Sequence, residues 1–488
     1  MGVRDGEASP TAMLADHLSA LTLDAVPPQV RHEAKRVLLD TLGCLAAGAR
    51  TEVGPIARSL GALYGNGDAV TVPAAPGRMS LLGGLYANGR IANAMDFDET
   101  FPVGAHFGVA AVTTALALAE RDGLSGAETL LALVAGYELG GRVASWIGPV
   151  AQVEGGRVTG FPLVWGVAAP VAMAAAGAAS RALGLGPALF AEAIGLAGSN
   201  APLPAGAQWS NAVDLPNCKY CDAGWCAVAG AFGALSAAAG STGFPRILDG
   251  AHGLASMCGV AHADASLLID RLGSRWMLSD VTYKPWPTCR FTHYPLTALA
   301  RLLAAEPIPP EAIEEIVIES GPLALSGRFT NPAPRTFASR QFSYPHMVAM
   351  LVLGYPAGPD WLDPAVAEAP AVAAMKAKVR VEPHPRGDSF AADFERNQIR
   401  TMPGGVRLRA GGKALHAETD FALGDPWTPE TRLDDAALAA KFRRLVGHGA
   451  ADRAIEAVLR LEALDDVEPL LAVLRAPAAG ASAARAAA

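Results

Sequence analysis

Two long stretches without a charged residue most constrain the fold of this chain. Residues 158–180 and 223–245 consist mainly of alanine, glycine and valine. Small side chains let helix backbones approach closely, so these stretches predict two core helices packed against each other. A membrane span is the alternative for the first stretch, but Pro162 and Pro170 interrupt it and its residues are only weakly lipophilic. The sequence therefore predicts a buried central helix, and no membrane partner is expected.

Length and charge limit the class of protein. The chain has 488 residues, which is long enough for two domains with a sizeable core. Hydrophobic residues make up 51% and charged residues 18%, as in a compact, helix-rich protein and not in a disordered one. The net charge of −8 comes without a basic patch or arm, so nucleic acid is not expected as a partner. An anionic substrate would need locally placed cations.

The N-terminus and the cysteines indicate the compartment. The first residues, MGVRDGEASPTAM, contain early acids and no apolar stretch, so no signal peptide is expected and a cytoplasmic location is predicted. Cys218 and Cys221 have CxxC spacing, and Cys226 is near. Neither a second pair of zinc ligands nor a preceding strand accompanies them. A metal or redox site is therefore disfavoured, and reduced thiols are expected.

Helical patterns fill the first 270 residues, with almost no strand signal. Two prolines begin one helix at residue 28, and its apolar side chains repeat at helical spacing up to Leu45. Further helices are predicted at 108–119, 126–140, 167–183, 188–196 and 225–239. The sequence contains no P-loop, no GxSxG and no GxGxxG after a strand, so no nucleotide cofactor is expected.

The pattern changes after residue 270. Alternating segments predict half-exposed strands at 314–320, 379–383, 406–410 and 414–421. Helical segments lie between them near 296–304 and 346–353. Helical periodicity returns at Leu433, with Asp434 as the expected N-cap.

These patterns predict a mainly α protein. We expect a large helical domain of residues 1–270, completed by residues 426–475, and an inserted, smaller α+β lid domain of residues 271–425. Residues 1 to about 10 and residues 476–488 are expected to be disordered tails.

The segment IANAMDFDETFPVGAHFG embeds acids and a hydroxyl in apolar sequence. Asp96, Glu99 and Thr100 are spaced to share one face of a helix. Pro102 would end that helix, and the chain would turn back with His106. Carboxylate, hydroxyl and imidazole groups in a dry pocket suit proton transfer near neutral pH. The alternative is a helix cap beside a solvated acidic turn.

Seven motifs, in this order and spacing, resemble the MmgE/PrpD family, which includes 2-methylcitrate dehydratase, cis-aconitate decarboxylase and iminodisuccinate epimerase. They are LLDTLGCLAAG at 38–48, NAMDFDET at 93–100, GYELGGRVA at 136–144, CKYCDAG at 218–224, KPWPTCRFTH at 284–293, QFSYP at 341–345 and GDPWTP at 424–429. The resemblance extends over about residues 12 to 470. It implies a homodimer without metal or organic cofactor, with the active site between the two domains.

The resemblance also implies roles for five residues. Asp96, Thr100, His106, Lys219 and His293 fall on active-site positions of the family. The family's small carboxylate substrates have an acidic C–H, so a base and cations for the carboxylates are needed. We expect His106 to be the acid/base, with Asp96 orienting it or acting as a second base. Lys219 would hold a substrate carboxylate, Thr100 would donate a hydrogen bond, and His293 would face the pocket from the lid.

Three positions depart from the family pattern. The segment GFPLVWG lacks a family histidine at about Pro162, Asp222 stands in place of a second histidine, and His346 stands in place of a tyrosine. Arg290, Lys284 (both weaker candidates for a carboxylate) and His346 are further candidates for binding substrate. The departures favour a substrate with fewer carboxylates, or with an apolar or amine-bearing arm.

Three functions remain open on the sequence. The favoured one is a cofactor-independent lyase, a dehydratase or decarboxylase, that acts on a small carboxylate. The alternative is an epimerase or isomerase that uses two bases on opposite faces of one carbon. The third is a homologue that binds a ligand or partner without catalysis.

Overall fold

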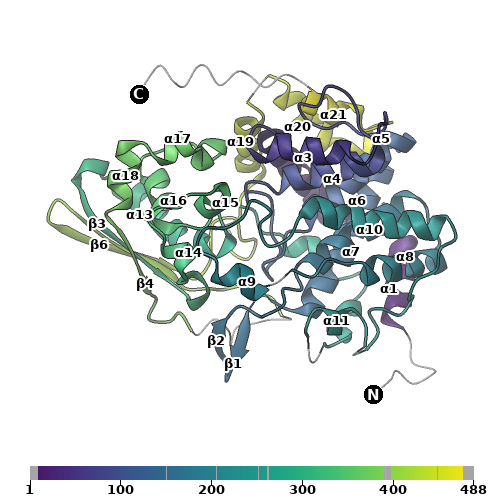
Figure 1. The fold of residues 1–488 in the computed structure, drawn as a ribbon, viewed down its shortest axis with the longest axis horizontal. Coiled ribbons are helices and arrows are strands. Elements are labelled where there is room, and N and C mark those ends of the chain that lie inside the picture. Colours follow the sequence, from purple (N-terminus) through teal and green to yellow (C-terminus); the bar gives the residue numbers. More distant parts are fainter. Residues whose placement is uncertain are drawn as a thin grey trace.

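The computed structural model describes residues 9–149, 151–204, 206–250, 252–260, 263–388, 391, 397–447 and 449–475. Most of its regular elements are helices, which confirms the mainly α class (Figure 1). The expected tail at 476–488 lies outside the described residues, and so do residues 1–8 of the other expected tail. The first helix, α1, already begins at Pro10.

One end of the molecule consists of helices and one small hairpin. The helices are α1 (Pro10–Ser19), α2 (Pro28–Gly48), α3 (Val53–Ala62), α4 (Leu81–Ala92), α5 (Gly108–Asp122), α6 (Gly126–Ile147), α7 (Ala168–Ala182), α8 (Pro187–Ser199), α9 (Gly206–Asn211), α10 (Ala223–Ala238), α11 (Leu254–Met257) and α12 (Ser266–Ile269). The helices that the apolar patterns predict in this region are all present, whereas the short helix expected at residues 96–100 is not. The hairpin β1–β2 (Gln152–Glu154 and Arg157–Gly160) was not predicted.

The two uncharged stretches form neighbouring core helices, as predicted. Helix α7 packs against α5, α6 and α10, and all its residues up to Ser180 are buried. A Cβ atom at Gly230 of α10 would lie 2.0 Å from the carbonyl oxygen of Ala172 in α7. Only a glycine permits this approach, because a larger residue would clash with backbone. None of the described helices has both the length and the apolar character that crossing a membrane requires.

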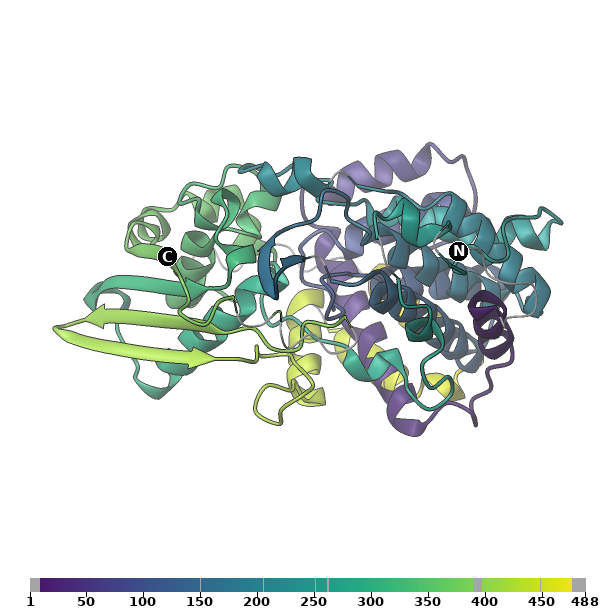
Figure 2. The same ribbon diagram turned by 90° about the horizontal axis from the view of Figure 1, so that it is seen from below.

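A four-stranded sheet and its helices occupy the other end of the molecule (Figure 2). The strand order is β4-β3-β5-β6, with β3 parallel to β4 and antiparallel to β5. The strands are β3 (Ile313–Ser320), β4 (Val379–Pro383), β5 (Gly404–Ala410) and β6 (Lys413–Thr419), which confirms the four predicted strands. The helices are α13 (His293–Ala305), α14 (Gly327–Thr330), α15 (Phe337–Arg340), α16 (Tyr344–Val352), α17 (Pro364–Ala367) and α18 (Pro370–Lys376).

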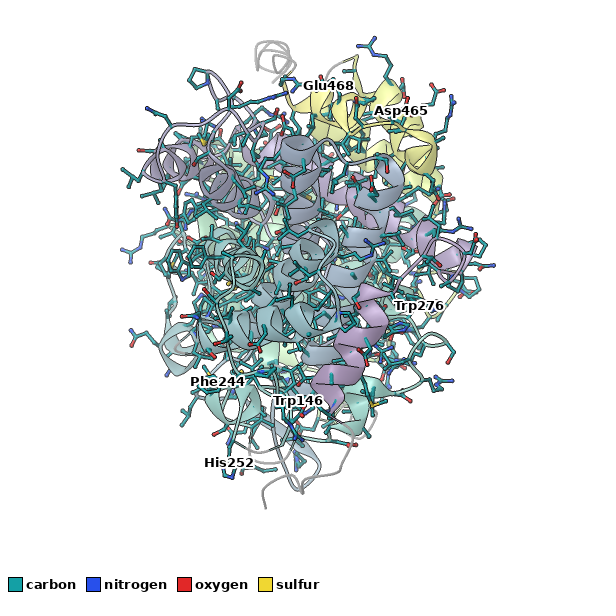
Figure 3. The ribbon with its side chains drawn as sticks, turned by 90° about the vertical axis from the view of Figure 1, so that its right-hand side faces the viewer. Trp146, Phe244, His252, Trp276, Asp465 and Glu468 are labelled. Carbon is teal, nitrogen blue, oxygen red and sulfur yellow. The ribbon has the colours of Figure 1, made fainter. Side chains whose placement is uncertain are left out.

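The last helices return to the helical end. They are α19 (Asp435–Val446), α20 (Ala451–Leu459) and α21 (Glu468–Arg475), and all three pack against α2. The Asp434 carboxylate accepts the amide of Ala437 at 2.7 Å and caps α19, as predicted. Figure 3 looks onto this end, where Asp465 and Glu468 lie far from Phe244 and His252. That residues 271–425 form an inserted lid stays a prediction.

Candidate active site

The segment between α4 and α5 carries the site, and it is irregular. Asp96 has a φ of +53°, in the left-handed region, which ends any helix at that residue. Four residues later, Thr100 pairs with Thr282, exchanging backbone hydrogen bonds of 2.9 and 3.0 Å. The predicted helical face of Asp96, Glu99 and Thr100 is therefore wrong. Pairing with a distant segment has replaced the local helix that the spacing suggested.

His106 lies buried between acidic and basic groups. Its Nδ1 atom is 3.2 Å from Asp98 Oδ2 and 3.0 Å from the carbonyl oxygen of Glu99. Its Nε2 atom is 3.3 Å from Asp96 Oδ1 and 3.4 Å from Lys284 Nζ. Since Nδ1 faces acceptors alone, we assign the ring proton to Nδ1, and the Nε2 lone pair then faces the Lys284 ammonium.

Burial and the Lys284 ammonium lower the pKa of His106, against the opposing effect of Asp98 and Asp96. The imidazole is therefore neutral near pH 7 and has a lone pair at Nε2. A neutral imidazole in this state is a competent general base.

Asp96 is held as an anion by two lysines. Its Oδ1 atom lies 2.8 Å from Lys219 Nζ and 3.2 Å from Lys284 Nζ. Burial raises the pKa of Asp96, but the two ammonium groups outweigh it and hold that pKa well below its usual range. Such a carboxylate orients its neighbours but takes up a proton poorly. The geometry therefore favours an orienting role for Asp96 over the role of second base.

The Lys219 ammonium donates its hydrogen bonds to other residues of the protein. Its Nζ atom donates to Asp96 Oδ1, to the carbonyl oxygen of Asn93 at 3.1 Å and to Asn93 Oδ1 at 3.2 Å. Three contacts use all three N–H groups of an ammonium. Lys284 also donates to the carbonyl oxygen of Asp96, at 2.9 Å. The expected grip of Lys219 on a substrate carboxylate stays a prediction, and it requires one of these contacts to break.

A second layer of acids supports the imidazole. Asp98 accepts both Asn93 Nδ2, at 3.0 Å, and the His106 side chain. Glu99 accepts the amide of Gly108 at 2.7 Å and the hydroxyl of Tyr137 at 2.8 Å. Burial, and then the Asp98 charge, raise the pKa of Glu99 to about 8, so this carboxyl is mostly protonated at neutral pH.

A pocket of about 30 Å³ meets this cluster, which is enough space for at least one water molecule. Both ends of the molecule line it. The helical end contributes Asp96, His106 and Tyr220, and the other end contributes Cys289, Arg290 and Arg328. Aromatic rings form most of the remaining wall. The Tyr220 hydroxyl has no hydrogen-bond partner within the described part of the chain, and burial, then Asp96, raise its pKa well above the usual value.

Besides Lys219 and Lys284, three more predicted residues lie outside the lining of this pocket. Thr100 Oγ1 donates to the carbonyl oxygen of Ala105 at 3.1 Å. His293 lies 2.9 Å from Thr288 Oγ1, and burial, then Arg290, lower its pKa well below the usual value. His346 Nε2 lies 2.6 Å from the carbonyl oxygen of Trp361. Each of the three side chains is held by a backbone or hydroxyl oxygen, and a substrate role for them stays a prediction.

The two remaining positions behave differently. Arg290 lines the pocket, as a substrate-binding residue should, but its guanidinium also forms an ion pair with the buried Asp425. Asp222 does not line this pocket. It pairs with Arg90, and it caps α10 by accepting the amide of Gly224 at 3.0 Å. The Asp222 carboxylate is therefore paired within the protein.

Family models match almost the whole chain. The MmgE/PrpD N-terminal domain matches residues 12–263, and the MmgE/PrpD C-terminal domain matches residues 286–463. The chain belongs to the MmgE/PrpD family. This confirms the resemblance drawn from the seven motifs.

The relatives of this MmgE/PrpD protein include a decarboxylase. Cis-aconitate decarboxylase of Homo sapiens is 27% identical over 486 residues, which cover 96% of this chain and 95% of the human protein. Cis-aconitate decarboxylase of Mus musculus is also 27% identical, over 489 residues that cover 96% of this chain and 94% of the mouse protein. These matches support a family of dehydratase and decarboxylase-type lyases.

Three pocket or near-pocket residues of the MmgE/PrpD protein were not assigned a role from the sequence. Asp98 lies in the acidic motif, and its contact with His106 follows from the irregular backbone. Tyr220 directly follows Lys219 in the motif CKYCDAG, and this position could have indicated a residue near the site. Arg328 lies in GRFTNP, where no motif points to it.

Metal ligation has no candidate in the described segments. No group of three or more His, Cys, Asp or Glu side chains there could hold a metal ion. The six cysteines are unpaired thiols.

Proposed function

We propose that this MmgE/PrpD protein is a lyase that moves a proton on or off a carbon next to a carboxylate of a small substrate. His106 Nε2 is the proton acceptor and donor. Proton removal leaves an enediolate-like anion, which a nearby cation stabilises. The Lys284 ammonium, 3.4 Å from His106 Nε2, is close enough to supply that stabilisation. The contact of 3.4 Å between His106 Nε2 and the Lys284 ammonium is the observation that carries the proposal.

The pocket favours one base over two. Asp96 has little affinity for a proton, because Lys219 and Lys284 stabilise its anion. Burial, and then the Asp96 charge, raise the pKa of Cys289 to about 12. Among the described pocket residues, His106 is left as the group that gains and loses a proton near neutral pH. An epimerase of the two-base type would need a second such group on the opposite face of the carbon.

Both lyase reactions can use this base. In a dehydration, His106 takes the C–H proton while the leaving hydroxide takes a proton from an acid. The Tyr220 hydroxyl lines the pocket and is a candidate for that acid. In a decarboxylation, carbon dioxide leaves, the electron pair of the broken C–C bond stays on carbon, and the carbon takes a proton from His106 Nε2, which must first have gained that proton from solvent. The decarboxylase relatives support the second reaction.

Two further expectations belong to this proposal. Residues from both ends of the molecule line the pocket, so a separation of the two ends would open it to a substrate. This supports the lid assigned to residues 271–425. The homodimer is supported by Trp225 and Phe232, which lie two turns apart on α10 and are 50% and 56% exposed.

Proton NMR in deuterated buffer tests the reaction. The panel is methylcitrate, citrate, cis-aconitate, iminodisuccinate and simple β-hydroxy acids. We expect a new vinyl signal or release of carbon dioxide from one of them. Exchange of one C–H for deuterium without a new product would replace the lyase with the epimerase.

Variants test the base. His106→Asn should lower turnover by about 100-fold or more while the fold survives. His384→Asn is the matched control, because His384 is also buried but does not line the pocket. Unchanged turnover in His106→Asn would remove this residue from the mechanism.

A further inference from the structure

Arg328 is a buried cation without a counter-ion among the residues that the structure describes. Its side chain on α14 is 1% exposed and lines the same pocket as Asp96 and His106. Its Nη1 atom donates to the carbonyl oxygen of Trp209 at 2.9 Å. Its Nε and Nη2 atoms have no hydrogen-bond partner within the described ranges, and no carboxylate described there forms an ion pair with it.

Aromatic rings frame this guanidinium on several sides. Its Cζ atom lies 4.1 Å from the ring centre of Trp209, 4.7 Å from Phe161, 5.2 Å from Phe329 and 6.0 Å from Phe342. Each ring attracts the cation, and together the rings exclude water and fix the plane of the group. Removing an ion from water is unfavourable. The Nε–H and Nη2–H groups of Arg328 do not offset this loss, because they have no hydrogen-bond partner in the described part of the chain.

Loss of a proton does not relieve that cost. Burial lowers the pKa of Arg328 to about 10, which still leaves the guanidinium charged near pH 7. Arg290 lines the same pocket and is relieved by its ion pair with Asp425. Two unpaired buried N–H groups on a charged side chain therefore distinguish Arg328 from its neighbour.

We propose that Arg328 binds one carboxylate of the substrate through its Nε–H and Nη2–H groups. These two N–H groups point in parallel from one edge of a guanidinium and match the two oxygens of a carboxylate. Lys219, the expected anchor, has its three donors in use. The proposal rests on the proposed function, because it takes the bound carboxylate to belong to the molecule that His106 acts on.

The walls of the site define the substrate class further. The carboxylate on Arg328 would lie among the rings of Phe161, Trp209, Phe329 and Phe342. Polar groups next to that carboxylate would lose their hydration without finding partners there. The carbon that carries this carboxylate is therefore an apolar or unsaturated one. This gives a physical basis for a substrate with fewer carboxylates than the usual polycarboxylates.

Isothermal titration calorimetry on the full-length protein tests the anchor. The probes are crotonate, fumarate and succinate, and crotonamide is the uncharged control for crotonate. Each is titrated up to about 10 mM, a concentration at which binding with a Kd of about 1 mM can be detected. We expect crotonate to bind and crotonamide to bind at least about tenfold more weakly. Arg328→Met should weaken crotonate about thirty-fold or more. Failure of all three carboxylates to bind the unaltered protein would overturn the proposal.

Thermal unfolding separates binding from structure. Arg328→Met removes an unpaired buried charge, so its Tm should stay or rise. Arg340→Met is the matched control, since this buried guanidinium donates to the carbonyl oxygens of Leu362 and Arg335 and does not line the pocket. It should lower the Tm and leave crotonate binding unchanged. A lower Tm with unchanged crotonate binding in Arg328→Met would show a structural arginine and overturn the proposal.

His106→Asn separates the two proposals. It should bind crotonate as the unaltered protein does, because His106 is not the anchor, yet lose the reaction. If the unaltered protein binds crotonate through Arg328 but neither transforms the substrate panel nor exchanges its protons, the proposed function fails and the anion site stands. If the reaction proceeds at the same rate and the same KM in Arg328→Met, the anchor fails and the proposed function stands.

Discussion

Two buried cationic regions reach the same pocket and differ in how their charge is compensated. Around Asp96, the ammonium groups of Lys219 and Lys284 share one carboxylate at 2.8 and 3.2 Å. At the other end, aromatic rings surround Arg328, and no carboxylate of the described residues forms an ion pair with it. The charges of the first region compensate one another without a ligand, so this region positions the base and the Lys284 ammonium beside it. The second is complete only when an anion is bound, so it selects the substrate.

Glu99 shows the third way in which a buried charge is relieved. Its pKa of about 8 means that it keeps its proton at neutral pH. A carboxylic acid can neutralise itself in this way, whereas a guanidinium with a pKa of about 10 cannot. A buried acid without a partner can keep its proton, so it does not need a counter-ion. A buried arginine without a partner stays charged, so it indicates that an anion is missing.

The largest effect should come from breaking the paired region. Asp96→Asn leaves two buried ammonium groups without their anion, which should cost about 3–5 kcal/mol in free energy of unfolding. Urea unfolding followed by circular dichroism measures the loss. The cost should greatly exceed that of Arg328→Met, because Arg328 has no ion pair to lose.

A double-mutant cycle sharpens that result. Lys219→Met alone should also destabilise the protein, since it removes one of the two cations that compensate Asp96. The double variant Asp96→Asn/Lys219→Met should cost less than the sum of the two single changes, because it removes both partners of one pair. Additive costs would mean that the two groups do not stabilise each other.

The helices and strands were predictable because their signals are local. The apolar period of α2 and the alternation in β3 need no knowledge of the rest of the chain. The hairpin β1–β2 escaped because its strands, of three and four residues, are too short to show an alternation. The capping aspartate of α19 was predictable for the same reason as α2: its partner lies three residues away.

The site was predictable in composition and not in geometry. The motifs brought Asp96, His106 and Lys219 into one site, and the structure places them together. The helical spacing failed because a bridge to Thr282 fixes the backbone at Thr100, and sequence spacing carries no information about that bridge. Arg328 was not predicted, because the observation that singles it out is the absence of partners for its Nε and Nη2 atoms in the described chain. A missing counter-ion can be recognised only after all neighbours are placed.

A second effect should appear in the pH dependence of stability. The pKa of Glu99 is raised from 4.5 to about 8 in the folded protein. Between these values the unfolded state alone loses the proton, so the stability of the unaltered protein falls as the pH rises. Glu99→Gln has no such loss. Its advantage should grow with pH by at most about 1.4 kcal/mol per unit between pH 4.5 and 8, and stay level outside that window.

Urea unfolding at a series of pH values measures this advantage. Glu128→Gln is a control of opposite sign, because hydrogen bonds from Ser125 lower the pKa of Glu128 at the start of α6. Its stability difference should not grow in favour of the variant as the pH rises. A flat difference for Glu99→Gln would mean that Glu99 is ionised in the folded protein and belongs with the paired charges.

The smallest effect should be a displacement of the pH profile of catalysis, and its sign identifies the base. His106 must be neutral to remove a C–H proton, so kcat/KM of a dehydration should fall on the acid side, below a pKa that burial and Lys284 lower from 6.5. Lys284→Met removes the cation that lowers this pKa, so the acid limb should move to higher pH by about one unit. Asp98→Asn removes an anion that raises it, so the limb should move to lower pH. Because a purely structural change gives no reason for opposite displacements, limbs that move together or stay in place would show that another group titrates.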